Sequence, residues 1–405
     1  MRHFRLCRVF LSVTLVVAAV GVVLSSTGAT ASSSAPTVPA HGLLFGAAVH
    51  NPAGSDIAGL EKSVGRTLAI HRVYSLWNTV QPTDEVRTDA AVGRVTLLSI
   101  RPQLIDGSKI SWASVAAGAQ DAQIRAQIEG LRALGRPILL AFHHEADLSS
   151  GYGTAAQFRA AFRQYVDVAR ATGETTISFV VILATSTYGS AVSSWYPGDD
   201  VVDWAGADTY NFAACSPGRL PWRSFATAVA SFRAWGASHD KPQVLAEWGS
   251  AEDPSVPGRK AQWITDAGTV MGDWPQLHAA SYFDESDSCD WQLSTSSSAL
   301  NAFRTLARSG LANGGPTARL SLTGLTSGGT ASWTAVGSTG TDHVTGDGVA
   351  SWSFDAGDAT TGQGSNAGPG TIRHTYGAAG TYTATLTICD RAGVLATTQS
   401  TIRVS

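Results

Sequence analysis

The sequence is poor in charge and in cysteine, and each shortage excludes a class of protein. Charged residues make up 15% of the 405 residues and the net charge is −3, so the chain offers no basic surface of the kind that holds nucleic acid. None of the four cysteines is spaced as Cys-x-x-Cys, and neither His-Glu-x-x-His nor Gly-x-Ser-x-Gly occurs. These absences argue against a zinc site and against an esterase nucleophile. We expect no metal, no cofactor and no nucleic-acid partner.

One long apolar run is present, at the N-terminus. Basic residues among the first eight are followed by the apolar stretch 9–24 and by the small residues Ala29-Thr30-Ala31. This layout is typical of a signal peptide, residues 1–31, cleaved before Ser32. A membrane anchor is the alternative, but a spanning helix needs roughly 20 apolar residues. We expect a secreted, extracellular monomer with no membrane association after cleavage.

Removal of the signal peptide also removes Cys7 and leaves an odd number of cysteines. In an oxidising compartment Cys215 and Cys289 can pair, which leaves Cys389 as a buried thiol. The spacing alone does not decide whether that pair forms.

Two compositions follow the signal peptide and a linker at 32–41. Residues 42–312 alternate short apolar runs with helical patterns, whereas residues 316–405 are rich in Gly, Thr and Ser and lack a helical period. The breaker-rich stretch "ANGGPTA" (312–318) separates them. We predict a large domain at 42–312, of the size of an enzyme's catalytic domain, and a small domain at 316–405.

The large segment contains eight strand candidates, most of them continuously apolar, as strands buried on both faces must be. They are residues 43–49, 71–77, 94–100, 137–143, 176–184, 201–208, 242–248 and 278–284. Helices are predicted within 121–137, 155–173 and 223–242 from one-sided apolar spacing and terminal glycines, whereas the connection before the sixth strand reads as a loop. This order predicts an α/β fold, a (β/α)₈ TIM barrel.

Such a barrel places its active site where the strands end, and polar and acidic residues gather there in this sequence. Glu145 ends the fourth strand, in "PILLAFHHEAD" (137–147), and Glu247 ends the seventh. Retaining glycoside hydrolysis needs such a pair, one carboxylic acid to protonate the departing oxygen and one carboxylate to attack the anomeric carbon. The alternative is that the glutamates have no catalytic role and that each only ends a strand in a solvated loop.

Four stretches resemble glycoside hydrolase family 26. The members of this family are secreted retaining enzymes on a (β/α)₈ barrel and include endo-β-1,4-mannanases. They are "FHHEAD" (142–147), "WYPGDDVVDWAGADTYN" (195–211), "LAEWGS" (245–250) and "YFDESDSCDWQL" (282–293). The resemblance implies that Glu145 is the acid/base, Glu247 the nucleophile and His144 a substrate-binding neighbour. The implied partner is a polysaccharide, first of all β-1,4-mannan.

Further residues are candidates for substrate contact. Tyr210, at the end of the sixth strand, is placed to donate a hydrogen bond to Glu247. Aromatic rings stack on sugars, which makes Trp77, Trp195 and Trp291 candidates, each with packing as the alternative. His50 and Arg101 close the first and third strands and are candidates for hydroxyl contacts. We expect Trp248 to pack away from the barrel axis, and His143 and Asp147 to be structural.

Alternatives stay open on substrate and on function. Family mannanases often carry a tryptophan shortly after the His-Glu pair, where this chain offers Tyr152, so β-1,3-xylan and mixed-linkage β-glucan remain candidate substrates for the same two glutamates. An inert barrel that only binds carbohydrate is the alternative from another class. The acidic cluster of the 282–293 stretch, Asp284, Glu285, Asp287 and Asp290, reads as a solvated loop rather than a calcium site.

The last 90 residues resemble a polycystic kidney disease (PKD) domain, an immunoglobulin-like β-sandwich. The resemblance rests on matching positions in "ASWSFDAGDA" (350–359) and "RHTYGAAGTY" (373–382), with Ala356 inserted in the first. Alternation of Tyr382, Ala384, Leu386 and Ile388 predicts a strand with one apolar face. We expect a spacer or weak adhesion unit without catalysis.

Overall fold

The computed structural model describes residues 38–39, 42–49, 56–212, 215, 220–309, 311–313, 318–336, 349, 351–365, 369–389 and 395–404. The predicted signal peptide, most of the linker and His50 lie outside these residues. Within the described ranges, no helix has the length and apolar character needed to cross a membrane.

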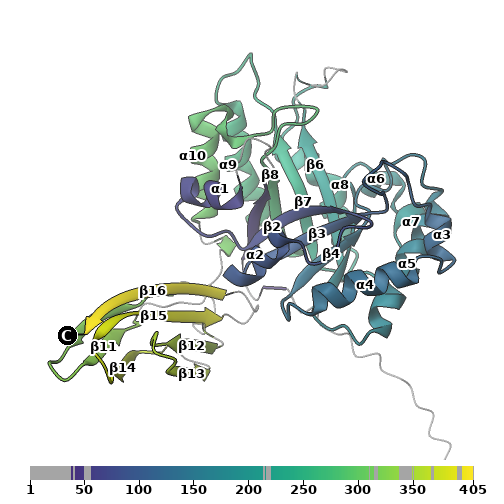
Figure 1. Ribbon diagram of the computed structural model, residues 1–405. Helices are drawn as coiled ribbons and strands as arrows, with labels where there is room; N and C mark the ends of the chain where they lie inside the picture. Colours follow the sequence, from purple (N-terminus) through teal and green to yellow (C-terminus); the bar gives the residue numbers. More distant parts are fainter. Residues whose placement is uncertain are drawn as a thin grey trace, which may run out of the picture. The chain divides into compact units, whose positions relative to one another are not determined.

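Eight parallel strands form a closed barrel (Figure 1). They are β1 (Leu43–Ala48), β2 (Ile70–Leu76), β3 (Val95–Arg101), β4 (Ile138–Phe142), β5 (Ile177–Ala184), β6 (Trp204–Asn211), β7 (Gln243–Ser250) and β8 (Leu277–Phe283). Neighbours in sequence are neighbours in the sheet, and β1 pairs with both β2 and β8, which closes the barrel. The short β9 (Ala312–Asn313) pairs outside the ring with β1. The predicted barrel is confirmed.

Helices connect the strands. They are α1 (Ile57–Val64), α2 (Asp84–Val92), α3 (Trp112–Ala116), α4 (Asp121–Arg132), α5 (Ala155–Ala171), α6 (Thr187–Ser190), α7 (Val192–Trp195), α8 (Phe225–Gly236), α9 (Arg259–Gly272), η2 (Leu293–Thr295) and α10 (Ser297–Ala307). The three predicted helices are present as α4, α5 and α8. The prediction of a pure loop before β6 was wrong, because two single-turn helices, α6 and α7, form there.

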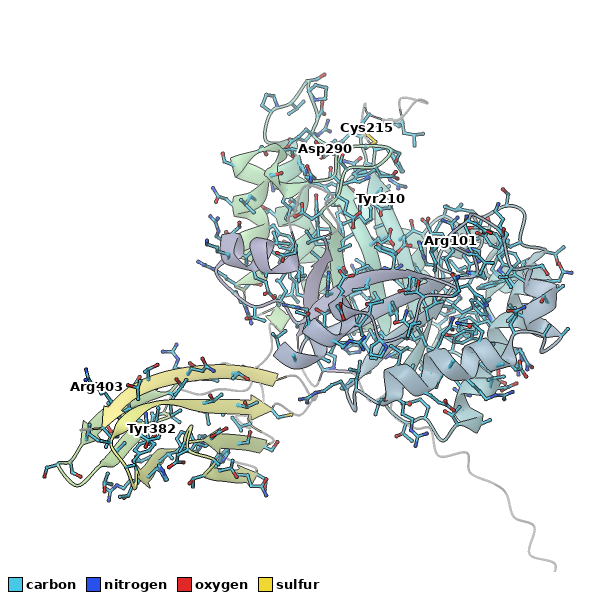
Figure 2. The ribbon with its side chains drawn as sticks, in the orientation of Figure 1. Arg101, Tyr210, Cys215, Asp290, Tyr382 and Arg403 are labelled. Carbon is cyan, nitrogen blue, oxygen red and sulfur yellow. A yellow bond between two sulfur atoms is a disulfide. The ribbon has the colours of Figure 1, made fainter. Side chains whose placement is uncertain are left out.

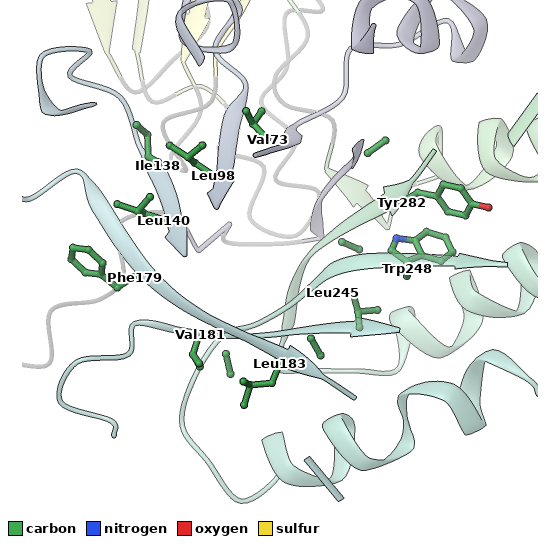
Figure 3. Close-up of a cluster of buried hydrophobic side chains, with 14 of the residues drawn as sticks. Val73, Leu98, Ile138, Leu140, Phe179, Val181, Leu183, Leu245, Trp248 and Tyr282 are labelled. Atoms are coloured by element: carbon green, nitrogen blue, oxygen red, sulfur yellow. The ribbon is translucent and has the colours of Figure 1, made fainter. Parts of the chain in front are cut away.

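Each strand is buried on both faces, which explains the continuous apolar runs. One set of side chains fills the barrel interior, including Leu44, Leu97, Leu139, Val180 and Val244. The alternate set packs against the surrounding helices and includes the residues labelled in Figure 3, such as Leu98, Leu140, Val181 and Leu245. Two-sided burial holds the strand ends, and therefore the groups they carry, in fixed positions.

The C-terminal residues form two antiparallel sheets around a core of their own. One contains β10 (Ser321–Leu325), β11 (Thr330–Thr334) and β14 (Thr371–Thr375), and the other β12 (Ser351–Asp355), β13 (Thr361–Ser365), β15 (Gly380–Cys389) and β16 (Leu395–Val404). Trp333 of the first sheet meets Phe354 of the second, with ring centroids 5.3 Å apart. In β15 the apolar residues alternate as predicted, with Ala384, Leu386 and Ile388 buried. The predicted β-sandwich is confirmed.

Candidate active site

A pocket of about 530 Å³ opens at the carboxyl ends of the barrel strands. It brings together six of the predicted site residues, which are Arg101, His144, Glu145, Tyr210, Glu247 and Trp291. These come from β3, β6, β7, the turn after β4 and the loop after β8, so residues distant in sequence converge on one site. The two glutamates, 102 positions apart, line the same cavity.

A β-bulge in β7 turns Glu247 into the pocket. β7 carries one extra residue relative to both neighbours, since Ala207 and Asp208 of β6 pair with Leu245 and Glu247, and β8 shows the same shift before Trp248. Val244 and Ala246 face the barrel interior, and the bulge lets Glu247 face it as well. Trp248 then packs outward among the helices with no exposed surface, as expected. Bulges beside active sites commonly re-aim a side chain in this way.

Three donors hold the Glu247 carboxylate. Its Oε1 accepts hydrogen bonds from Arg72 Nη2 (3.1 Å) and from the Tyr74 hydroxyl (2.8 Å), and its Oε2 accepts one from the Tyr210 hydroxyl (2.5 Å). Burial and then the charge of Glu247 raise the pKa values of both tyrosines well above 10, so both remain donors. Such charge-assisted bonds stabilise the ionised carboxylate and fix its orientation, as a nucleophile requires.

Glu145 lies in a strained turn directly after β4. His143 and Glu145 have φ of 52° and 50°, in the left-handed region that non-glycine residues rarely adopt, and the Glu145 amide donates to Ile182 O of β5 (2.9 Å). Strain of this kind persists only where surrounding contacts enforce it, and it clusters at functional sites. Burial first, then the neighbouring charges of Glu247 and Asp147, raise the pKa of Glu145 to about 7. A substantial fraction of Glu145 is therefore protonated at neutral pH and can donate its proton.

Asp208 adds a third carboxyl to the site. It pairs with Glu247 in the β6–β7 ladder, is 3% exposed, and neither of its carboxyl oxygens has a hydrogen-bond partner among the described residues. Burial first, then the charges of Glu247 and Glu145, raise its pKa well above the usual value. Asp208 therefore keeps its proton to a higher pH than an ordinary aspartate does.

The two histidines before Glu145 have different environments. Burial lowers the pKa of both, so both are neutral. His143 accepts a hydrogen bond from Trp112 Nε1 (2.9 Å) and is structural. His144 faces the pocket, with its ring 5.4 Å from that of Tyr74. Asp147 accepts from Ala184 N (3.0 Å) and Thr187 Oγ1 (2.5 Å), which ties the turn to the end of β5.

Two of the predicted stacking residues do not reach the pocket. Trp77 is 2% exposed, and its indole donates to Gln120 Oε1 (3.0 Å) inside the outer core. Trp195 packs edge-on against Trp112, with centroids 6.0 Å apart. We therefore assign both to packing, because Trp77 is buried and the half-buried Trp195 packs against Trp112 and Phe158, and neither lines the pocket. Trp291 does line the pocket, with its ring 4.7 Å from that of Tyr210, and Arg101 lines it while donating to the Tyr152 hydroxyl (3.1 Å).

Three residues at the site, Arg72, Tyr74 and Leu148, are not among the residues predicted from sequence. Arg72 and Tyr74 stand two positions apart in "HRVYSLW" and both face inward, a period-two signal that was available in the sequence. Leu148 lines the pocket with 63% of its surface exposed, and no sequence pattern marks an exposed leucine as functional. Across the described residues, no group of three or more His, Cys, Asp or Glu side chains is arranged to hold a metal ion.

Known proteins resemble this chain in sequence and in fold. Endoglucanase H of Acetivibrio thermocellus is 30% identical over 285 residues, which cover 67% of this chain and 31% of that protein. A β-1,3-xylanase of Alcaligenes sp. is 31% identical over 169 residues, covering 39% of this chain and 34% of that protein. The chain thus spans about a third of the length of these curated relatives.

Solved structures share the architecture. A modular endo-β-1,4-mannanase of glycoside hydrolase family 26 from Cellulomonas fimi superposes with a TM-score of 0.50 and 17% identity, covering 90% of this chain and 94% of that one. The PKD domain family matches residues 318–405. The chain therefore has the fold of the family 26 mannanases, followed by a C-terminal PKD domain.

Proposed function

We propose that this protein is a secreted, retaining, endo-acting glycoside hydrolase of family 26 that cleaves a β-linked polysaccharide with Glu145 and Glu247. One observation carries the proposal. Two glutamates line one pocket in complementary states, since Glu145 has its pKa raised to about 7 whereas Glu247 accepts three hydrogen bonds. Environments that divide two carboxyls into an acid and a carboxylate are the requirement of glycoside hydrolysis.

In the first step, Glu247 attacks the anomeric carbon. The glycosidic carbon–oxygen bond breaks, its electron pair goes to the departing oxygen, and that oxygen takes the proton of Glu145. The product leaves, and the remaining sugar is joined to Glu247 as an ester. Arg72 and Tyr74 keep the carboxyl aimed through Oε1.

In the second step, Glu145 acts as a base. Formation of the ester removes the negative charge of Glu247, one of the causes that raise the pKa of Glu145, so that pKa falls and Glu145, which has just given up its proton, stays ionised. Glu145 then takes a proton from water, the water oxygen attacks the anomeric carbon, and Glu247 leaves as a carboxylate. The same residue serves both steps because its neighbour changes charge between them.

Two polysaccharides are the leading candidate substrates. The sequence resemblance to family 26 favours β-1,4-mannan. The 30% identity to an endoglucanase favours a β-glucan as the second candidate, and that likeness is closer in sequence than the 17% identity to the Cellulomonas fimi mannanase. Reducing-sugar release from mannan, glucomannan, barley β-glucan and β-1,3-xylan, with product anomers followed by NMR, distinguishes these candidates and tests retention.

Azide rescue assigns the two glutamates with a substrate that has a good leaving group. With Glu145→Ala, the ester on Glu247 still forms and azide attacks it from the opposite side, so we expect a β-glycosyl azide. With Glu247→Ala, azide takes the place of the nucleophile, so we expect an α-glycosyl azide. Equal activity of both variants and the wild type, or exchanged azide products, would contradict the assignment. A carbohydrate-binding barrel without catalysis would bind polysaccharide and release no sugar in any assay.

A further inference from the structure

The loop after β8, residues 284–292, forms one wall of the pocket. Glu285, Asp287, Ser288 and Trp291 of this loop line it. The loop is folded on itself, since Ser286 and Asp290 form an isolated bridge and the Asp287 amide donates to Cys289 O (3.0 Å). Its polar side chains therefore stand on a tight turn rather than on a barrel strand.

Hydrogen bonds hold this loop at its two ends. At the end, Trp291 O accepts from the Tyr282 hydroxyl (2.9 Å) and from Lys260 Nζ (3.1 Å). At the start, the Asp284 amide donates to Ala48 O (2.9 Å), and Asp284 Oδ1 accepts from the Leu293 amide (2.6 Å). These contacts fix where the loop leaves and rejoins the barrel.

The covalent tie lies at the tip of the loop. Cys289 forms a disulfide with Cys215 in the loop after β6, and the two Cα atoms are 5.7 Å apart (Figure 2). The Cys215 amide donates to Phe212 O (3.0 Å), and the Phe212 ring packs edge-on against Trp291 at 5.2 Å. The disulfide therefore connects the ends of β6 and β8 beside Asp287 and Ser288.

We propose that the Cys215–Cys289 disulfide determines how tightly the enzyme binds its polysaccharide, by fixing the Asp287–Ser288 side of the pocket wall. The inference rests on the proposed function and adds a specificity-determining element to it. A covalent cross-link removes conformations in which the turn swings away from the pocket, so less ordering is needed when sugar binds. In the reduced protein, binding itself must order the turn.

The chemical step should not depend on the disulfide. Glu247, Arg72 and Tyr74 stand on strands β7 and β2, and Glu145 is held in its turn by Ile182 of β5. The third donor to Glu247, Tyr210, stands on strand β6, before the loop that carries Cys215 begins. None of these five residues belongs to the loops that the disulfide joins. We therefore expect loss of the disulfide to raise KM and to leave kcat nearly unchanged.

The test compares Cys215→Ala/Cys289→Ala with Cys389→Ala in the full chain. Cys389 is a thiol in β15 and is not part of the disulfide, so its variant controls for loss of a sulfur atom. On the polysaccharide that the wild type cleaves best, we expect the double variant to raise KM at least fivefold and to leave kcat within twofold. Amide hydrogen exchange at residues 286–290 should accelerate in the double variant and stay unchanged in Cys389→Ala.

Other outcomes overturn the inference. Unchanged KM with unchanged exchange would show that the turn is fixed without the cross-link. A fall in kcat, or faster exchange throughout the barrel strands, would show that the disulfide holds the fold as a whole. A wild type that releases sugar from no polysaccharide contradicts the proposed function instead, and the exchange measurement then still decides whether the disulfide fixes the turn.

Discussion

Tyr74 and Tyr210 donate their hydroxyls to opposite oxygens of one carboxylate, at 2.8 Å to Oε1 and 2.5 Å to Oε2 of Glu247. The two tyrosines come from β2 and β6, on different sides of the barrel. Glu247 is thus held across the barrel, with Arg72 as the third donor. The carboxylate keeps one orientation because a rotation would break bonds on both sides at once.

The first prediction concerns these two hydroxyls. A hydrogen bond to a charged group contributes about 1.5–3 kcal/mol, and a tenfold rate change corresponds to about 1.4 kcal/mol. Tyr74→Phe and Tyr210→Phe should therefore each lower kcat/KM about 10- to 100-fold while the far-ultraviolet spectrum stays that of the wild type. Tyr188→Phe is the matched control, because that buried hydroxyl donates to Gly206 O and does not line the pocket. A Tyr74 variant with wild-type kinetics would contradict the role given to β2.

The second prediction concerns pH. Burial and the charge of Glu247 raise the pKa of Glu145 to about 7, and the first chemical step needs the protonated form. The protonated fraction falls as pH rises through that value, so kcat/KM should decline above about pH 7. Glu145→Gln cannot ionise, and with a substrate whose leaving group needs no proton its rate should show no such decline. A pH profile of kcat/KM for both proteins checks this, and a decline that persists in the variant would assign it to another group.

The barrel could be predicted from the sequence because a strand that is buried on both faces appears there as a continuous apolar run. The predicted strand boundaries lie within three residues of the observed ones. The largest difference is in β6, which was predicted to start at Val201 and starts at Trp204. Val201 and Val202 are buried but precede the strand pairing. Burial is visible in a sequence, whereas the hydrogen-bond ladder is not.

The site could be predicted only in part. Its glutamates follow from their places at strand ends, but the inward aim of Glu247 depends on a bulge, which no period-two pattern reveals. Composition does not say which tryptophans lie at the pocket, so Trp77 and Trp195 were proposed for sugar although neither lines it. Arg72 was missed because a buried arginine is rare, and it is stabilised here by Glu247 and Ser99, which are distant in sequence.

The third prediction separates the tryptophans. Truncating a buried aromatic residue costs about 3–5 kcal/mol, so Trp77→Ala should lower the free energy of unfolding by that order and leave KM unchanged where the protein is folded. Trp291 is equally buried, so Trp291→Ala should also lower the free energy of unfolding. It should in addition raise KM, because its ring lines the pocket and packs against Tyr210. Denaturant unfolding and steady-state kinetics, measured on both variants, distinguish the two roles. A raised KM for a fully folded Trp77→Ala variant would show instead that Trp77 contacts the sugar.

The fourth prediction concerns Leu148. This side chain lines the pocket with 63% of its surface exposed, and its amide donates to Glu145 O (3.0 Å), so it stands beside the proton donor. The departing sugar must lie on that side, since Glu145 protonates its oxygen. An exposed aliphatic group there offers apolar surface to the sugar ring, and covering it contributes about 1–2 kcal/mol at roughly 25 cal/mol per Å².

Leu148→Ala should therefore lower kcat/KM about 5- to 30-fold on oligosaccharides that place a sugar in the leaving position. The same variant should cleave an aryl glycoside with a small leaving group at close to the wild-type rate, because that substrate does not cover Leu148. Val92→Ala, an exposed valine at the end of α2 that does not line the pocket, is the control for loss of surface apolar area. Equal losses on both substrates would mean that Leu148 supports the turn of Glu145 rather than the departing sugar.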